Sequence, residues 1–394
     1  MRGRIAIIIE RADVALGGAE RSVTELAAAL SEVGWTVDIL AAKGAEDRPH
    51  VHVLCRDVPG KRISLRIFAQ ALQPHLAETH YGIVHSVLPL DFCDVYQPRG
   101  GTYAETLARH IASYRSRCQR GFKRVTALTN VRRTRLLRAE RKLCGPAQGP
   151  VIAALSRYVA DQFKKHYGTD DRRLVLIRNG VATNRPSPAE TAARLRSQIL
   201  SQLTIPNGSD PLLMLFAAHN FRLKGLDSLI RALHSAGMTS CDRMPCLIVM
   251  GAGHASPYRR LAQRLGVEER VIFLGSSENV CDVLAVSDVG VLPTYYDPSS
   301  RFILEALAAG KPVITTAFNG ATDHFVAGRH GLVIDTPDDV EALAQAIVHF
   351  ADPGHAAKAT EAIVADKLKE TLSVGRVARE LSALYESILR RKSS

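Results

Sequence analysis

The chain has 394 residues, of which 46% are hydrophobic and 23% are charged. These fractions are ordinary for globular proteins, so a disordered or fibrous chain is excluded, and the length predicts two domains that each bury a core. With 51 lysines and arginines against 39 acids the net charge is +12. Such a surplus predicts an anionic partner: nucleic acid, a membrane surface or a phosphorylated ligand.

Neither a membrane span nor an export signal is expected. No segment is apolar over the roughly 18 residues that cross a bilayer. The apolar run at the start, Ile5–Ile9, is shorter than the roughly 7–15 residues of a signal peptide and predicts a buried first strand instead. The seven cysteines are odd in number and form no CxxC pair, which predicts reduced thiols in a cytoplasmic protein.

Short apolar runs alternate with helical patterns along the first half of the chain, as in βαβ units with parallel sheets. The first strand leads to Gly17-Gly18 and to a helix with apolar residues at Val23, Leu26, Ala27 and Leu30. Later strands are predicted at 36–41, 83–87, 151–155 and 174–177, with a helix from Ser156 to His166.

The second half repeats this alternation after a polar, proline-bearing stretch at 183–210, which contains one short helix at 190–203. Its strands are predicted at 212–217, 247–250, 271–274, 289–292 and 312–316. The pattern predicts an α/β protein with two Rossmann-like domains facing a cleft, at 1–186 and 187–373. An amphipathic helix in 374–394 is expected to return toward the N-terminal domain.

Two short motifs follow strands of the second half. Arg222 and Lys224 could neutralise the two phosphates of a nucleotide diphosphate, although a solvated turn would also explain them. Gly251 and Gly253 would let a ligand approach the backbone closely. Because Ser256 occupies the third glycine position of GxGxxG, a dehydrogenase is disfavoured.

A third motif places two carboxylates, Asp297 and Glu305, eight residues apart around a predicted helix start. The free N–H groups and the dipole of such a helix start suit a phosphate or a sugar. Glu305 lies in the apolar stretch 302–309, where burial of a carboxylate is costly unless it meets donors such as ribose hydroxyls. An exposed position on the helix is the structural alternative.

Together these motifs resemble the retaining glycosyltransferases of the GT-B fold, family 4, and within it the WaaG-like glucosyltransferases that build lipopolysaccharide cores. The segments that carry the resemblance are Gly17-Gly18-Ala19-Glu20, Asn179-Gly180, Asn220–Gly225, Tyr295–Ser299 and the acid–x7–acid motif that ends at Glu305.

The resemblance implies a C-terminal domain that binds a nucleotide-diphospho-sugar, with UDP-glucose as the expected donor. Its catalytic set would be Arg222, Lys224, Asp297 and Glu305. Donor contacts are expected from Gly17, Gly18, Gly251, Gly253, Leu274, Ser299, Ser300, Arg301 and Phe302. The chain departs from the family by having Asp297 instead of Glu, and Ala218-His219 where relatives often have an arginine.

In the N-terminal domain, Asp94 and Arg99 are the candidates for the acceptor side, although either could be structural. The resemblance implies retention of anomeric configuration and no cofactor. No DxD motif occurs in the chain, so no metal is expected.

Residues 99–142 contain thirteen lysines or arginines against two acids, which is +11 of the total +12. Long apolar and aromatic residues are interleaved with these charges, and basic amphipathic helices of this kind lie on anionic membranes. A solvated charged surface is the alternative, and nucleic acid is not expected because no nucleic-acid module surrounds the stretch. The stretch therefore favours docking on a membrane. In the family 4 enzymes that the chain resembles, membrane-associated members dock through such a region of the N-terminal domain. The resemblance thus implies peripheral attachment to the inner face of the cytoplasmic membrane and a lipid-linked or lipopolysaccharide-core acceptor.

Two other functions stay open at this point. A nucleotide-sugar epimerase or hydrolase of the same fold would need no acceptor. A non-catalytic protein that binds membrane or RNA could also have kept the fold.

Overall fold

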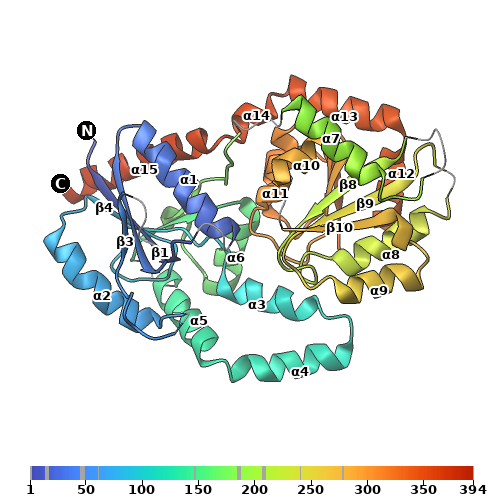
Figure 1. Cartoon of the computed structure of the whole chain (residues 1–394). Coiled ribbons are helices and arrows are strands. Elements are labelled where there is room, and N and C mark those ends of the chain that lie inside the picture. The colour runs from blue at the N-terminus through green and yellow to red at the C-terminus, as the bar shows by residue number, and fades with distance from the viewer. Residues whose placement is uncertain are drawn as a thin grey trace. The chain divides into compact units, whose positions relative to one another are not determined.

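A computed structural model describes residues 2–13, 17–44, 49–60, 62–145, 148–183, 188–205, 210–239, 241–276 and 279–393. The chain forms two compact α/β units (Figure 1). The first contains Met1–Ile111, Arg115–Val181 and Ser373–Ser394, and the second contains Ala112–Tyr114 and Ala182–Leu372. The chain thus enters the second unit after Val181, whereas the sequence predicts the boundary at 186; residues 184–187 lie outside the described ranges.

The first unit is built on a seven-stranded sheet in the order β3-β2-β1-β4-β5-β6-β7, in which all neighbouring strands are parallel. The interior strand β1 is apolar along most of its length, with Ile5, Ile7 and Ile8 fully buried, as expected of a parallel strand covered on both faces. The strands are β1 (Arg4–Arg11), β2 (Thr36–Lys43), β3 (Val51–Val53), β4 (Ile83–Ser86), β5 (Val95–Tyr96), β6 (Val151–Ala154) and β7 (Leu174–Leu176).

Side-chain caps fix where several helices of this unit begin. The Ser64 hydroxyl accepts a hydrogen bond from Ile67 N at the start of α2, and Ser156 accepts one from Val159 N at the start of α6. The helices are α1 (Gly18–Glu32), α2 (Leu65–Glu78), α3 (Tyr103–Ala112), α4 (Arg117–Leu128), α5 (Val131–Cys144), α6 (Arg157–Tyr167), the 3-10 turn Asp171–Arg173 and α15 (Val374–Ser393).

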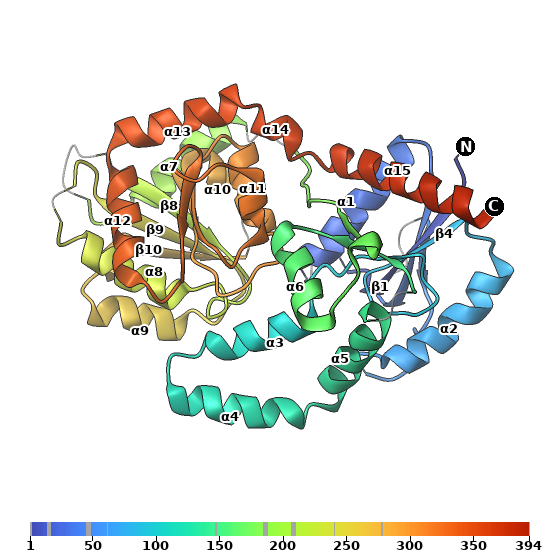
Figure 2. The same ribbon diagram turned by 180° about the vertical axis from the view of Figure 1, so that it is seen from behind.

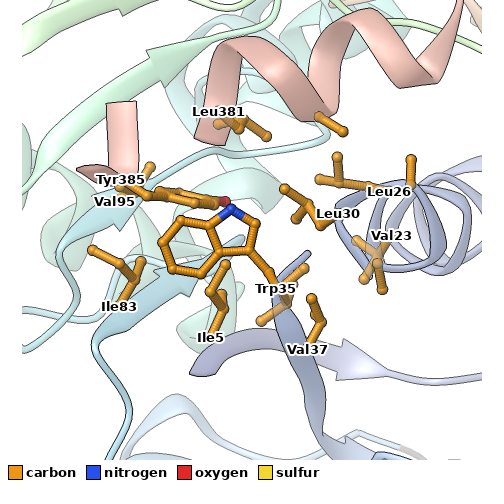
Figure 3. Packing of buried hydrophobic residues seen from close by; sticks show 14 of the residues in the cluster. Ile5, Val23, Leu26, Leu30, Trp35, Val37, Ile83, Val95, Leu381 and Tyr385 are labelled. Atoms are coloured by element: carbon orange, nitrogen blue, oxygen red, sulfur yellow. The ribbon is translucent and has the colours of Figure 1, made fainter. Parts of the chain in front are cut away.

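The C-terminal helix α15 supplies part of the core of the first unit (Figure 3). Trp35 Nε1 donates a hydrogen bond of 2.9 Å to Ser382 Oγ. The Trp35 ring meets the Tyr385 ring edge to face, with centroids 5.8 Å apart. Tyr385 in turn lies 2.6 Å from His85 Nδ1 on β4, so α15 is fastened to the centre of the sheet.

The second unit has a six-stranded parallel sheet in the order β10-β9-β8-β11-β12-β13. Its strands are β8 (Leu212–Ala217), β9 (Pro245–Met250), β10 (Val271–Gly275), β11 (Val289–Leu292), β12 (Val313–Thr316) and β13 (Gly331–Ile334). Its helices are α7 (Ala189–Leu200), α8 (Leu226–Ala236), α9 (Ser256–Arg264), α10 (Val280–Val286), α11 (Arg301–Ala308), α12 (Val340–Ala351), α13 (Pro353–Ala365), α14 (Leu368–Thr371) and the 3-10 turns Glu268–Arg270 and Gly320–His324.

Two parallel-sheet α/β units confirm the predicted fold class. Three strands of the structure, β3, β5 and β13, are not among the strands predicted above. β3 has only three residues. β5 has only two residues, too few for a recognisable period. β13 follows a turn region with no long apolar run, since its sequence is Gly-Leu-Val-Ile.

Candidate donor site

The turn between β8 and α8 has a fixed backbone that positions Lys224. The side chain of Asn220 accepts a hydrogen bond from Leu223 N, and Lys224 N donates to Asn220 O. Gly225 has a φ of +80°, and a Cβ there would lie 1.9 Å from the carbonyl oxygen of Pro293. Only glycine fits this position, so the Lys224-Gly225 pair of the sequence has a local structural reason.

Lys224 and Asp297 form an ion pair inside the second unit. Lys224 Nζ lies 2.6 Å from Asp297 Oδ2 and donates a second hydrogen bond, of 2.9 Å, to Tyr296 O. The two side chains are only 19% and 13% exposed. The structure therefore brings together two of the residues that the sequence predicts to act on the donor.

The loop before α11 is held in place by a buried asparagine that the sequence reasoning missed. Asn319 Oδ1 accepts hydrogen bonds from Ser300 N and Ala321 N, and its amide donates to Thr315 Oγ1. Ser300 Oγ caps α11 by accepting from Ile303 N. The available signal was an Asn-Gly pair shortly after the predicted strand 312–316, because this pair marks a tight turn.

Glu305 is buried, and the structure provides a partner for it. Arg301 Nη2 lies 3.2 Å from Glu305 Oε1, and the two side chains are 13% and 9% exposed. One turn of α11 thus separates an arginine and a carboxylate near the helix start. Phe302 beside them is packed in the core, so only its backbone amide is available to a ligand.

Arg222 is held by residues of the α3–α4 turn that belong to the second unit. Its guanidinium carbon lies 3.6 Å from the centroid of the Tyr114 ring, and Nη1 donates to Ser113 Oγ at 2.5 Å. Stacking on an aromatic ring together with a hydrogen bond fixes the plane of a guanidinium. Arg222 is therefore oriented before any ligand binds.

Neighbouring protein atoms leave no room for a side chain at Gly251 or Gly253. A Cβ on Gly251 would lie 1.8 Å from Ala218 O, and a Cβ on Gly253 would lie 2.6 Å from the Phe221 ring. Packing of the β8–α8 turn on the β9 loop therefore requires glycine at both positions, and the ligand contacts predicted for them stay predictions. Leu274 is half-buried near the end of β10, two residues before the gap at 277–278 in the described chain.

Gly17 and Arg99, two residues that the sequence predicts to contact ligands, lie in the first unit. Gly17 has extended backbone and precedes α1, while residues 14–16 lie outside the described ranges. Arg99 follows the carboxyl end of β5 and donates to Asn179 Oδ1 at 3.4 Å. Both lie at the sheet edge where ligands bind in parallel α/β folds, and their predicted contacts stay predictions.

Asp94 has a structural role in place of the predicted acceptor contact. It precedes the amino end of β5, opposite to the ligand-binding edge of a parallel sheet. Its Oδ2 accepts from Val84 N at 2.8 Å, and its Oδ1 pairs with Lys392 Nζ at 2.7 Å. The carboxylate thereby ties β4 to the last turn of α15.

The basic stretch folds as α3, α4 and α5 (Figure 1). On α4, Phe122 and Val125 are 66% and 65% exposed among arginines and a lysine. Glu140 on α5 is buried and accepts hydrogen bonds from Tyr96 OH and Tyr103 N, each at 2.7 Å, and from Tyr167 OH. Burial raises the pKa of Glu140 to about 7.

The described residues contain neither a membrane-spanning helix nor a cluster of metal ligands. No helix among them has the length and apolarity to cross a membrane. Within the same ranges, no three His, Cys, Asp or Glu side chains are grouped so that they could hold a metal ion.

Two family models match separate parts of the chain. The one described as "Glycosyltransferase Family 4" matches residues 16–185, and the one described as "Glycosyl transferases group 1" matches residues 210–352. The first covers most of the first unit, and the second covers the strands and helices that carry Lys224, Asp297 and Glu305.

Curated relatives match about half of the chain. The lipopolysaccharide glucosyltransferase WaaG of Escherichia coli (strain K12) is 30% identical over 187 residues, which are 48% of this chain and 49% of that protein. The D-inositol 3-phosphate glycosyltransferase of Streptomyces avermitilis is 29% identical over 218 residues, 51% of this chain and 46% of that protein. The chain thus spans about half the length of the curated relatives it matches.

The fold as a whole is shared with solved structures. The crystal structure of Anabaena Alr3699/HepE in complex with UDP-glucose superposes with a TM-score of 0.73 at 17% identity, over 98% of this chain and 100% of that one. From these matches and the two parallel-sheet units, the chain belongs to the family 4 glycosyltransferases of the GT-B fold.

Proposed function

We propose that the protein is a retaining glycosyltransferase that moves a sugar from a UDP-sugar, with UDP-glucose as the first donor to test, to a lipid-linked or lipopolysaccharide-core acceptor. The observation that carries the proposal is the cluster of Lys224, Asp297, Arg301 and Glu305 at the start of α11. A nucleotide-diphospho-sugar has a diphosphate, a sugar and a ribose, and this cluster offers a cation, a carboxylate beside a helix start, and a second carboxylate.

Each residue then has a separate task. Lys224 neutralises the diphosphate, with Arg222 as a second cation. The amides of Ser299 to Phe302 hold a phosphate oxygen or a sugar hydroxyl at the positive end of the helix dipole. Asp297 accepts from a donor-sugar hydroxyl and Glu305 from the ribose hydroxyls. Fixed charges in a partly buried site stabilise a leaving diphosphate more strongly than water does.

The proposed reaction breaks the bond between the anomeric carbon and the diphosphate oxygen. A new bond forms from the acceptor hydroxyl oxygen to the same carbon, on the same face, and the hydroxyl proton passes to the departing diphosphate. Lys224 and Arg222 stabilise the negative charge that develops on that leaving group. In this proposal they supply the charge that a metal would otherwise supply, so activity is expected in the presence of a chelator.

The acceptor side is proposed to dock on an anionic membrane through α4. The exposed Phe122 and Val125 would enter the interfacial region while Arg117, Lys123 and Arg124 meet lipid phosphates. Attachment would be peripheral, at the inner face of the cytoplasmic membrane.

A nucleotide-sugar screen tests the donor half of the proposal. We expect UDP-glucose and UDP to raise the melting temperature of the purified protein, because a ligand that binds only the folded state stabilises it. Slow release of UDP from the donor without an acceptor is also expected, and NMR of the released sugar reports its anomeric configuration. Absence of both binding and turnover for every UDP- and GDP-sugar would overturn the enzyme assignment in favour of a non-catalytic protein. An interconverted nucleotide-sugar as the only product would identify an epimerase.

A further inference from the structure

A cavity of about 900 Å³ lies in the first unit between the start of α2 and α5, two helices that Figure 2 shows on one side of that unit. Its walls include Glu10 near the end of β1, Ala42 near the end of β2, and Leu88–Asp91 after β4. It therefore lies at the carboxyl edge of the sheet, where α/β folds bind ligands. Pockets for small molecules usually have about 300–1,000 Å³, so this one accepts a sizeable ligand.

The inner wall of the cavity is apolar. It is formed by aliphatic and aromatic side chains from α2, α5 and the segment after β4, among them Ile63, Phe68, Leu88, Leu90, Leu136 and Leu143. Each of these six residues is less than 9% exposed. Such a surface suits a hydrocarbon chain and offers no hydrogen-bonding partners to the hydroxyls of a sugar.

Positive charges border this apolar wall. Five cations line the cavity, Arg62, Arg66, Arg132, Arg135 and Lys142, against two acids, Glu10 and Asp91. Arg132 pairs with Glu10 at 2.5 Å. In the part of the chain that the structure describes, the other four cations form no ion pair. An anion bound here would meet charges that the protein itself leaves uncompensated.

The placement of two of these arginines strengthens the case for an anion. Arg66 lies in the first turn of α2 and Arg132 in the first turn of α5, and neither first turn contains an acid. A cation at a helix N-terminus opposes the helix dipole, and an anion beside it relieves that repulsion. Two helix starts and five cations therefore face the same apolar cavity.

We propose that this cavity binds an amphiphile with a phosphate group next to an apolar chain, and that this amphiphile is the acceptor; the inference rests on the proposed function. The hydrocarbon chain contacts the wall around Phe68 and Leu136, and the phosphate lies among Arg66, Arg135 and Lys142. β1 contributes Glu10 to the cavity, and Gly17-Gly18 follow β1 in the chain. The end of the acceptor that receives the sugar is therefore placed at this edge of the sheet.

Dodecyl phosphate below its micellar concentration is the probe, because a monomeric ligand reports the cavity and not attachment to a membrane. We expect calorimetry to show saturable binding of dodecyl phosphate, with dodecanol and inorganic phosphate binding at least ten-fold more weakly. Equal binding of inorganic phosphate would mean a simple anion site and would overturn the proposal. Equal binding of dodecanol would overturn the role of the cations.

Variants locate the binding site. Arg135 lines the cavity, so Arg135→Glu should weaken the binding of dodecyl phosphate at least ten-fold. Arg138 is also exposed on α5 but lies outside the cavity, so Arg138→Glu should leave that binding unchanged. An equal loss in both variants would contradict a specific site. Ala139→Trp fills the cavity and should also abolish binding of dodecyl phosphate. If this variant does not fold, the comparison of Arg135→Glu with Arg138→Glu provides the test. UDP-glucose binding is measured on the same samples. If the protein binds UDP-glucose but not dodecyl phosphate, the proposed acceptor cavity is wrong while the proposed glycosyltransferase function stands.

Discussion

Lys224 and Asp297 are 73 positions apart in the chain, and their side chains meet at 2.6 Å. One follows β8 and the other follows β11, and these two strands are neighbours in the sheet. The carboxyl ends of neighbouring parallel strands lie at one edge, which explains how a local motif and a distant one form a single site.

Lys224→Ala is expected to lower kcat about 10²–10³-fold, the usual effect of removing one donor that stabilises a developing negative charge. The measurement is UDP release from the donor in the presence of acceptor. Lys369→Ala, which changes an exposed lysine of α14, is the matched control and should keep full activity. Activity near that of the unchanged protein in Lys224→Ala would remove Lys224 from the site.

Glu305→Ala is expected to weaken UDP binding about 10–100-fold, because hydrogen bonds to a charged group contribute about 1.5–3 kcal/mol. Glu305→Gln keeps one acceptor oxygen and should lose less. Arg301→Ala removes the side chain that lies 3.2 Å from Glu305, and it should weaken UDP binding as well. Calorimetric titration of UDP measures all three, with Glu361→Ala on the exposed face of α13 as the control. Unchanged affinity in Glu305→Ala contradicts the ribose contact.

Glu140 predicts a defined dependence of stability on pH. Burial raises its pKa from 4.5 to about 7 in the folded protein, so the folded state holds a proton that the unfolded chain releases. Its contribution is therefore complete below about pH 4.5 and is lost as the pH rises to about 7. At about 1.4 kcal/mol per pKa unit, this loss amounts to roughly 3 kcal/mol.

Urea unfolding between pH 4.5 and 8 measures that dependence. Glu140→Gln cannot titrate, so its free energy of unfolding should change less with pH than that of the unchanged protein. Glu268→Gln replaces an exposed carboxyl and should leave the pH dependence as it was. Parallel curves for Glu140→Gln and the unchanged protein would show that the buried carboxyl does not titrate in this range.

Membrane attachment is best tested on α4 and not on α5. Arg132 and Arg135 line the cavity of the first unit, so reversing their charge would disturb two properties at once. Arg117 and Arg124 are exposed on α4. Because a surface cation contributes about 1 kcal/mol on an anionic membrane, the double reversal Arg117→Glu/Arg124→Glu should weaken co-sedimentation with anionic vesicles about thirty-fold or more.

The matched control for that experiment is Arg260→Glu/Arg264→Glu on α9, which changes the net charge equally on the second unit. Binding by the unchanged protein should also fall with added salt. Equal losses in the two double variants, or sedimentation that ignores salt, would argue against α4 as the docking helix.

Parallel strands could be predicted because buried runs such as Ile5–Ile9 in β1 and the whole of β8 are apolar. The acid pair Asp297 and Glu305 could be predicted because carboxylates beside or within an apolar helix need partners. Asn319 could not be ranked above other turn asparagines, because its three hydrogen bonds reach residues 4 and 19 positions before it and 2 after it. The structural reason for Gly251 and Gly253 could not be read from the sequence, because the atoms that exclude a side chain there belong to Ala218 and Phe221, which are distant in the chain.

The helix that packs on Trp35 has a consequence for how this chain is made. The second unit is nearly continuous, from Ala182 to Leu372, but the first is completed only by Ser373–Ser394. A ribosome therefore finishes every strand of the second sheet before the residues that cover Trp35 leave the exit tunnel. We expect the nascent first unit to keep an open apolar face throughout that interval, and the later unit to reach its native core before the earlier one.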